Sequence, residues 1–378
     1  MKKNYPVTGM SLDNIKIKII EARQLKHQAA FETESGFIFP ELNIAYHTYG
    51  KLNAAKNNVI WVCHALTANS DALDWWNGLI GKGRIFDPKN YFIVCANMLG
   101  SCYGATNPSS VHPSTNKAYG KDFPVITIRD MVHSHQILQQ HLGIDRIRLL
   151  LGGSMGGQQA LEWSIIAPDL FDRVALFASN AKHSAWGIAF NESQRMALEA
   201  DSTLYTDALN AGQKGLEAAR SVAMLSYRHY DTYQSTQTDT DGRIDDFRAS
   251  SYQRYQGLKL WKRFEPLSYI TLGKAMDNHD VGRERGGLKS ALQQVKAPTL
   301  VVGIQSDVLF PISEQRFMAK YIPDAQFEAI DSLYGHDGFL IEYKKMTYLL
   351  EEFLAKGAQE KALLNGHQNG EMPGTELF

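Results

Sequence analysis

The sequence predicts an α/β fold in which a mostly parallel central sheet is covered by helices on both faces and carries an inserted helical lid. Strand-like and helix-like segments alternate from about Leu42 to Ala178, and the alternation resumes from Thr299 to about Ala355. Such alternation is typical of a parallel sheet between two helical layers. From Ala181 to about Gln294 the apolar residues are scattered and no comparable strand is visible, which favours a helical insertion.

These patterns predict a core in two parts, residues 1–180 and 297–357, with a helical lid domain at residues 181–296. Residues 358–378 are expected to form a flexible C-terminal tail, because Asn, Gly, Glu and Pro gather near the end without periodicity. A chain of 378 residues with 44% apolar content can bury a substantial core.

Composition excludes several classes of function. The net charge is −1 and no basic stripe is visible, which argues against nucleic-acid binding. No run is apolar enough to cross a bilayer or to act as a signal peptide, so we expect a cytoplasmic protein without membrane contact. Three cysteines give no disulfide framework, and Cys102, in a Gly-rich loop, is expected to be a small buried thiol.

The segment Gly152–Gly157 contains a Gly-x-Ser-x-Gly core. A strand-like run, 146–151, precedes it, and a helix-like run from Gln158 to Ala167 follows until Pro168. This strand-turn-helix setting is what a nucleophile elbow requires, because the serine occupies a sharp turn that only small neighbours allow. Ser154 is therefore the candidate nucleophile.

A serine hydroxyl needs a base, and the base needs a partner that fixes its tautomer. Asp307 follows the expected strand 298–304 and is the candidate acid, while His336 follows the expected strand 325–330 and is the candidate base. Both follow strands at the edge where parallel sheets build their sites. Asp307 could instead cap a helix that begins near Pro311, and His336 is one of twelve histidines.

The developing negative charge on an attacked carbonyl needs two backbone N–H donors. We expect these from Met155, which follows the nucleophile, and from Leu66, which leaves the strand that begins at Val59. His64 at the end of that strand is expected to pack and hydrogen-bond. No metal-ligand spacing, phosphate loop or dinucleotide fingerprint is present, so the expected chemistry is acyl transfer without a metal or cofactor.

The chain resembles the homoserine O-acetyltransferase family, whose members have the α/β-hydrolase fold, over nearly its whole length except the two ends. Segments that carry the resemblance include 63–67, 97–104, 152–157, 188–192, 254–257, 306–311 and 335–337. The resemblance implies transfer of an acyl group from acyl-coenzyme A to the hydroxyl of L-homoserine, a step of methionine biosynthesis. The expected co-substrate is acetyl-CoA. It also implies ping-pong kinetics through acyl-Ser154.

Two further roles come from the resemblance. In the family, an arginine in a lid helix and the aspartate after the catalytic histidine hold the amino acid. On the matching segments these are Arg220, suited to the α-carboxylate, and Asp337, suited to the α-ammonium. Without the resemblance, Arg220 is an exposed helix residue. Family members are commonly homodimers built through the lid.

One position departs from the family's pattern. Asn107 stands near the acyl-donor side, where the family usually has glycine. A homoserine or serine O-succinyltransferase on the same scaffold therefore stays an alternative. A carboxylic-ester hydrolase would keep Ser154, Asp307 and His336 without needing Arg220 or Asp337. A binding protein on this scaffold would not need an intact triad.

Overall fold

The strands of the protein form one large sheet and one small hairpin. The structure is a computed structural model that describes residues 22–368, with side chains to residue 356. The strands are β1 (Arg23–His27), β2 (Phe31–Glu32), β3 (Ile38–Phe39), β4 (Leu42–Tyr49), β5 (Val59–Cys63), β6 (Phe92–Ala96), β7 (Leu149–Gly153), β8 (Val174–Phe177), β9 (Thr299–Ile304) and β10 (Ala325–Ile330). Eight strands form the sheet in the order β1-β4-β6-β5-β7-β8-β9-β10. From β6 to β10 in this order every pairing is parallel, whereas the β1–β4 and β4–β6 pairings are antiparallel. The predicted α/β fold is confirmed.

Strand β5 shows why the sheet is covered on both faces. Val59, Trp61 and Cys63 belong to one buried apolar cluster, and Ile60 and Val62 belong to another. Because successive side chains of a strand point to opposite faces, both faces need a helical layer. The helices of the first layer are α2 (Ile128–His141), α3 (Met155–Ile166) and α10 (Ile312–Tyr321), and those of the second are α1 (Ala72–Trp75), α11 (Gly338–Ile341) and α12 (Tyr343–Gln368).

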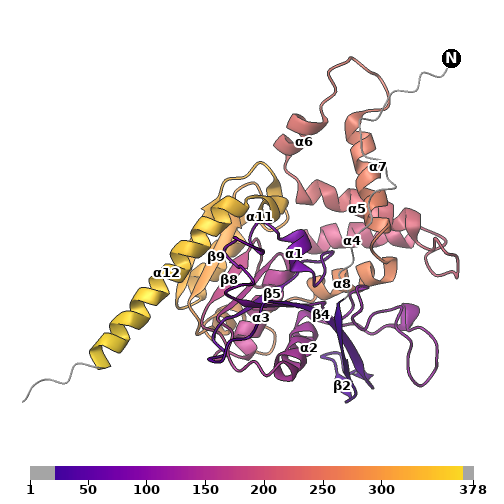
Figure 1. The fold of residues 1–378 in the computed structure, drawn as a ribbon. Coiled ribbons are helices and arrows are strands. Elements are labelled where there is room, and N and C mark those ends of the chain that lie inside the picture. Colours follow the sequence, from indigo (N-terminus) through magenta and orange to yellow (C-terminus); the bar gives the residue numbers. More distant parts are fainter. Residues whose placement is uncertain (1–21, 369–378) are drawn as a thin grey trace, which may run out of the picture.

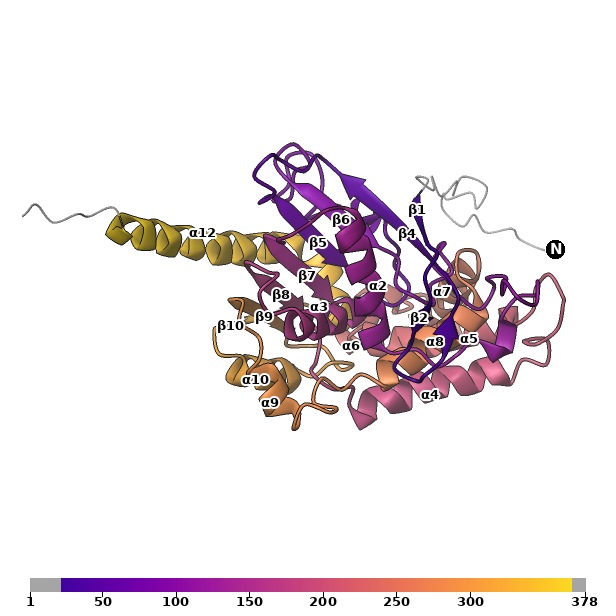
Figure 2. The ribbon, with the colours of Figure 1, turned by 90° about the horizontal axis from the view of Figure 1, so that it is seen from below.

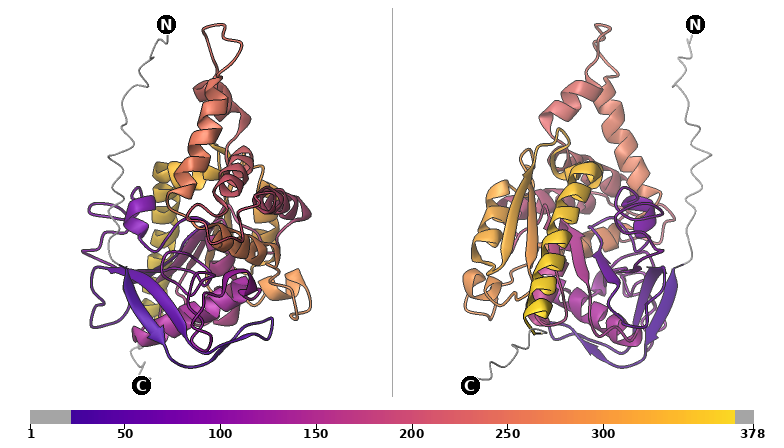
Figure 3. Two further views of the ribbon diagram at one scale, coloured as in Figure 1. Left: turned by 90° about the vertical axis from the view of Figure 1, so that its right-hand side faces the viewer. Right: turned by 60° about the vertical axis from the view of Figure 1, so that its left-hand side comes forward.

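The lid lies over the carboxyl ends of the parallel strands (Figure 1). Its helices are α4 (Ala185–Glu199), α5 (Gln213–Tyr227), α6 (Tyr230–Gln237), α7 (Arg248–Trp261) and α8 (Pro266–Asp277). Helices α6 and α7 and their connecting loop extend away from the sheet (Figure 3). Lid residues such as Leu198, Leu216 and Leu272 share one apolar cluster with Leu66 and Phe310 of the core, so the lid packs directly over the strand ends.

The end of the lid segment packs differently from its middle. Val281 belongs to the same apolar cluster as Val59 and Trp61 of β5, and so does Leu292 of helix α9 (Leu288–Leu292). Arg285 also pairs with the buried Glu162 of α3 at 2.6 Å. Residues from about 281 therefore lie with the core, although the sequence predicted the lid to continue to 296. Scattered apolar spacing does not distinguish a lid contact from a core contact.

The C-terminal segment is partly helical where the sequence predicted a flexible tail from residue 358. Helix α12 continues to Gln368 and runs out past the sheet (Figure 2). Residues 358–364 contain Ala, Gln, Glu, Lys and Leu, which favour helix. Residues 369–378 lie outside the described part of the chain. Within residues 22–368, no helix is both long and apolar enough to cross a membrane.

Candidate active site

Ser154 lies in the sharp turn between β7 and α3. Its backbone has φ 57° and ψ −129°, a conformation that costs a non-glycine residue about 1–3 kcal/mol. The turn is held from both sides, because the Ser154 N–H donates to the Phe177 oxygen of β8 at 2.9 Å and the Ser179 hydroxyl donates to the Ser154 oxygen at 2.9 Å. The local geometry is that of a nucleophile elbow.

Asp307 and His336 meet just beyond the ends of β9 and β10. His336 Nδ1 lies 2.7 Å from Asp307 Oδ2, and both side chains are buried. Asp307 Oδ1 accepts the backbone N–H groups of Leu309 and Phe310 at 2.8 and 2.9 Å. Since backbone donors fix one carboxylate oxygen, the other oxygen is aimed at the imidazole. This arrangement leaves Nε2 as the nitrogen that can exchange a proton with a serine.

Aromatic side chains hold the His336 ring. Phe310 stacks on it with ring centres 5.1 Å apart and an interplanar angle of 23°, and Phe339 meets it edge-on at 5.4 Å. Tyr227, the last residue of the lid helix α5, lies at 5.8 Å. The imidazole is therefore fixed by contacts from both the core and the lid.

A cavity of about 990 Å³ connects these groups. Five of the predicted site residues line it, and they come from the core and the lid: Leu66, Ser154, Arg220, His336 and Asp337. The other two predicted residues are buried beside it, Asp307 against His336 and Met155 at the start of α3. The structure thus brings together residues that are far apart in the sequence.

The loop that carries Leu66 is a tight turn, in which the Ala68 N–H donates to the Ala65 oxygen at 3.0 Å. His64 supports this turn. Its Nδ1 lies 2.9 Å from the Ala65 oxygen, and its Nε2 accepts the Met98 N–H at 3.2 Å. Burial lowers the pKa of His64 to about 4, so the ring is neutral at pH 7. The structure agrees with the expected packing and hydrogen-bonding role of His64.

Arg220 and Asp337 line the lid side of the cavity, and Arg228 forms an ion pair with Asp337. Arg220 Nη1 is buried and has no hydrogen-bond partner among the described residues. Asp337 Oδ2 is 2.8 Å from the Nε of Arg228, the residue that follows α5. Sequence reasoning missed Arg228, and no spacing signal could have found it. Arg220 thus offers one buried donor, Nη1, for an anion, whereas the ion pair with Arg228 already balances part of the charge of Asp337.

The same cavity is lined by Lys259, Lys262 and Arg263, from the end of α7 and the residues after it. Burial, together with the positive charges of Arg263 and Arg220, lowers the pKa of Lys259. This electropositive wall suits a ligand with several negative charges. The sequence analysis did not single out these three residues, because isolated basic residues on a helix are usually exposed.

Cys102 lines the cavity, and burial raises the pKa of its thiol to about 12, so it is protonated at pH 7. Asn107 is buried but is not among the residues that line the cavity, and it closes its own loop, since its Nδ2 donates to the Ala105 oxygen at 2.7 Å and its Oδ1 accepts the Ser109 N–H at 2.8 Å. Within residues 22–368, no group of three or more His, Cys, Asp or Glu residues is arranged to hold a metal ion.

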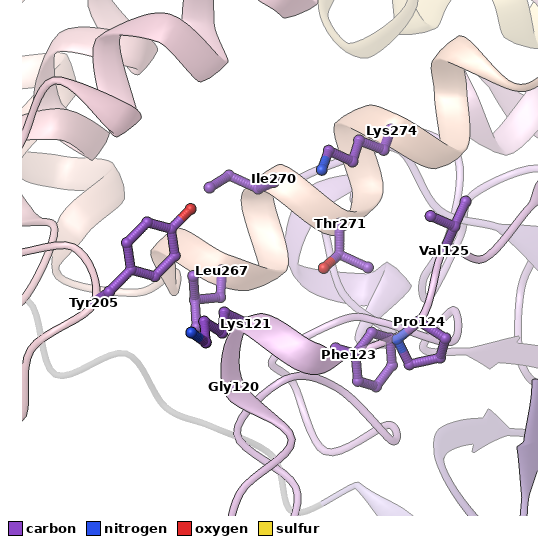
Figure 4. Close-up of a pocket in the computed structure, with 10 residues that line it drawn as sticks. All are labelled: Gly120, Lys121, Phe123, Pro124, Val125, Tyr205, Leu267, Ile270, Thr271 and Lys274. Carbon is purple, nitrogen blue, oxygen red and sulfur yellow. The ribbon is translucent and has the colours of Figure 1, made fainter.

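A second hollow lies between the loop at residues 120–125 and helix α8 (Figure 4). Its volume is only about 80 Å³, and Tyr205, Leu267 and Lys274 are among the residues around it. It shares no residue with the cavity at Ser154, and its lining contains no serine, cysteine or histidine. The larger cavity is therefore the candidate active site.

Comparison with known proteins agrees with the class that the sheet and the elbow define. The family model described as "alpha/beta hydrolase fold" matches residues 58–343. The solved structure of esterase E22 superposes with a TM-score of 0.81 at 23% identity, covering 88% of this chain and 99% of that one. A solved homoserine O-acetyltransferase from Bacillus anthracis has the same TM-score of 0.81 at 24% identity, covering 88% and 98% of the two chains. At these identities the likeness shows the fold.

Closer sequence relatives define the particular family. The homoserine O-acetyltransferase of Cyclobacterium marinum is 50% identical over 326 residues, which cover 86% of this chain and 93% of that protein. That of Chlorobium chlorochromatii is 46% identical over 332 residues, with the same two coverages of 86% and 93%. The chain belongs to the homoserine O-acetyltransferase family of the α/β-hydrolase fold.

Proposed function

We propose that this protein transfers the acetyl group of acetyl-CoA to the side-chain hydroxyl of L-homoserine, with Ser154 as the transient carrier. One observation supports this function over simple hydrolysis. The cavity that holds Ser154 and His336 also holds Arg220, whose buried donor is unpaired among the described residues, and Asp337. A hydrolase that uses water as acceptor has no need for a charged clamp in its acceptor site.

In the first half-reaction, Ser154 Oγ attacks the thioester carbonyl of acetyl-CoA, while His336 Nε2 takes the serine proton. The buried Asp307 stabilises the imidazolium that forms. The N–H groups of Leu66 and Met155 stabilise the oxyanion. The carbon–sulfur bond then breaks, and the coenzyme A thiolate leaves with the proton from His336. Lys259 and Lys262 are suited to the phosphates of the donor.

In the second half-reaction, L-homoserine enters the vacated cavity. Arg220 binds the α-carboxylate and Asp337 binds the α-ammonium, which directs the hydroxyl toward acetyl-Ser154. His336 takes the hydroxyl proton as the oxygen attacks the ester, and then returns it to Ser154 Oγ as O-acetyl-L-homoserine leaves. No metal or cofactor takes part. We propose that this reaction is a step of methionine biosynthesis and that it takes place in the cytoplasm.

The proposed enzyme is a homodimer built through the lid. Large apolar side chains at or between the ends of α5, α6 and α7 are exposed, including Leu225, Tyr230, Phe247 and Ile244, of which Ile244 is 95% exposed. Such side chains favour a protein partner. Light scattering coupled to size-exclusion chromatography should give twice the monomer mass of 42.4 kDa, and a monomer at micromolar concentration would contradict this.

The function is tested by thiol release with two donors, acetyl-CoA and succinyl-CoA, and with L-homoserine, L-serine or no acceptor. We expect rapid release only with acetyl-CoA and L-homoserine, and none with Ser154→Ala. Equal release without acceptor would indicate a hydrolase, and release with succinyl-CoA alone would assign a succinyltransferase. Mass spectrometry after incubation with acetyl-CoA alone should place one acetyl group on Ser154.

A further inference from the structure

Arg263 connects the lid to the loop beside the nucleophile. It lies between α7 and α8, and its Nη1 donates to the backbone oxygen of Thr67 and, at 2.9 Å, to the hydroxyl of Tyr103. Its Nη2 lies 3.5 Å from Thr67 Oγ1. A single lid side chain therefore contacts two of the core loops that border the cavity.

The bond to Thr67 acts on Leu66 through two peptide groups. The Thr67 C=O and the Ala68 N–H belong to one planar trans peptide, so fixing the oxygen also fixes the direction of that N–H. The Ala68 N–H donates to the Ala65 oxygen at 3.0 Å. The Ala65 C=O and the Leu66 N–H belong to a second planar trans peptide, so the Leu66 N–H must point away from the Ala65 oxygen, out of the turn.

We propose that Arg263 is a positioning residue that sets the oxyanion hole, and that the hole is complete only when the lid is seated on the core. The guanidinium orients the Leu66 N–H through this chain of peptides and polarises it, because hydrogen bonds in series strengthen one another. His64 Nδ1 also lies 2.9 Å from the Ala65 oxygen, so the turn is held from the core side and from the lid side. The inference rests on the proposed function, in which Leu66 stabilises the oxyanion.

The inference is tested with two acetyl donors of different charge. Acetyl-CoA carries phosphates that Arg263 could bind directly, whereas p-nitrophenyl acetate carries none. We expect Arg263→Met to slow acetylation of Ser154 about tenfold or more with both donors, while the KM for p-nitrophenyl acetate changes little. Arg263→Lys should recover part of the rate. Affinity for a small alkyl boronic acid, which forms a tetrahedral adduct with the serine, should fall by a similar factor.

Control variants separate the possible outcomes. Arg254→Gln removes an exposed arginine of α7, the lid helix that precedes Arg263, and should behave as the wild type. A loss in Arg263→Met that is confined to acetyl-CoA would make Arg263 a phosphate ligand and overturn the proposal. A lower melting temperature with unchanged acetylation and boronate affinity would make its role purely structural. If wild-type Ser154 is not acetylated by acetyl-CoA, the proposed function fails, whatever the variants do.

Discussion

Replacing Arg220 by methionine is expected to abolish acceptor recognition without destabilising the protein. Arg220 Nη1 is buried and unpaired among the described residues, and its guanidinium carbon lies 5.1 Å from the centre of the Tyr227 ring. A buried donor without a partner costs about 1–3 kcal/mol, and a cation–π contact contributes about 1 kcal/mol. Methionine keeps apolar contact with the ring. The free energy of unfolding should therefore stay the same or rise by up to about 2 kcal/mol.

The kinetic effect should be confined to the second half-reaction. Two charge-assisted hydrogen bonds to the α-carboxylate contribute roughly 3–4 kcal/mol together, so kcat/KM for L-homoserine should fall between about 10²-fold and 10³-fold. Acetylation of Ser154 by acetyl-CoA, measured in rapid-quench experiments without acceptor, should change less than about threefold. Urea denaturation of the unliganded protein gives the stability change.

Arg228→Met is the matched control because Arg228 is already paired. Its Nε lies 2.8 Å from Asp337 Oδ2, and the two side chains are 21% and 14% exposed. Removing it leaves a mostly buried carboxylate without its partner, so this variant should lose about 1–3 kcal/mol of stability. The reasoning is refuted if Arg220→Met destabilises as much as Arg228→Met, or if it slows both half-reactions equally.

Three further predictions concern the pair of Asp307 and His336, the buried His135 and the elbow at Ser154. In Asp307→Asn the two backbone donors would hold the amide oxygen, so the NH₂ group would face His336 Nδ1 and force the proton onto Nε2. Because a protonated Nε2 cannot accept the serine proton, kcat should fall about 10³-fold to 10⁴-fold with little change in KM. A smaller loss in steady-state assays would contradict the tautomer argument. His135 lies buried in α2, and burial lowers its pKa from 6.5 to about 4. The unfolded state therefore binds a proton that the folded state does not, and the free energy of unfolding falls as the pH falls through this window. Between pH 7 and pH 5 the wild type should lose about 2 kcal/mol more than His135→Gln in urea denaturation, and an equal loss in the two proteins would refute this. A Cβ at Gly156 would overlap the backbone oxygen of Cys63, so Gly156→Ala should cost about 3 kcal/mol or more, checked by urea denaturation.

The position of the candidate nucleophile was predictable because its signal is local. A strand-like run, small residues around Ser154 and a helix-like run together specify the elbow, and the observed φ of 57° is what such a turn needs. Asp307 and His336 could be selected because the carboxyl ends of parallel strands meet at one edge of the sheet. Their 2.7 Å contact follows from that topology.

The sequence by itself therefore determined the alternation of strands and helices, the insertion between them, and which residues follow the strand ends. Only the tertiary structure decided that Arg228 pairs with Asp337, that Arg263 reaches Thr67, and that the residues from about 281 return to the core. These contacts join segments far apart in the chain and depend on how the lid is seated. Periodicity and spacing report only the local backbone and the face that a residue presents, so they carry no information about which distant side chain comes to meet it.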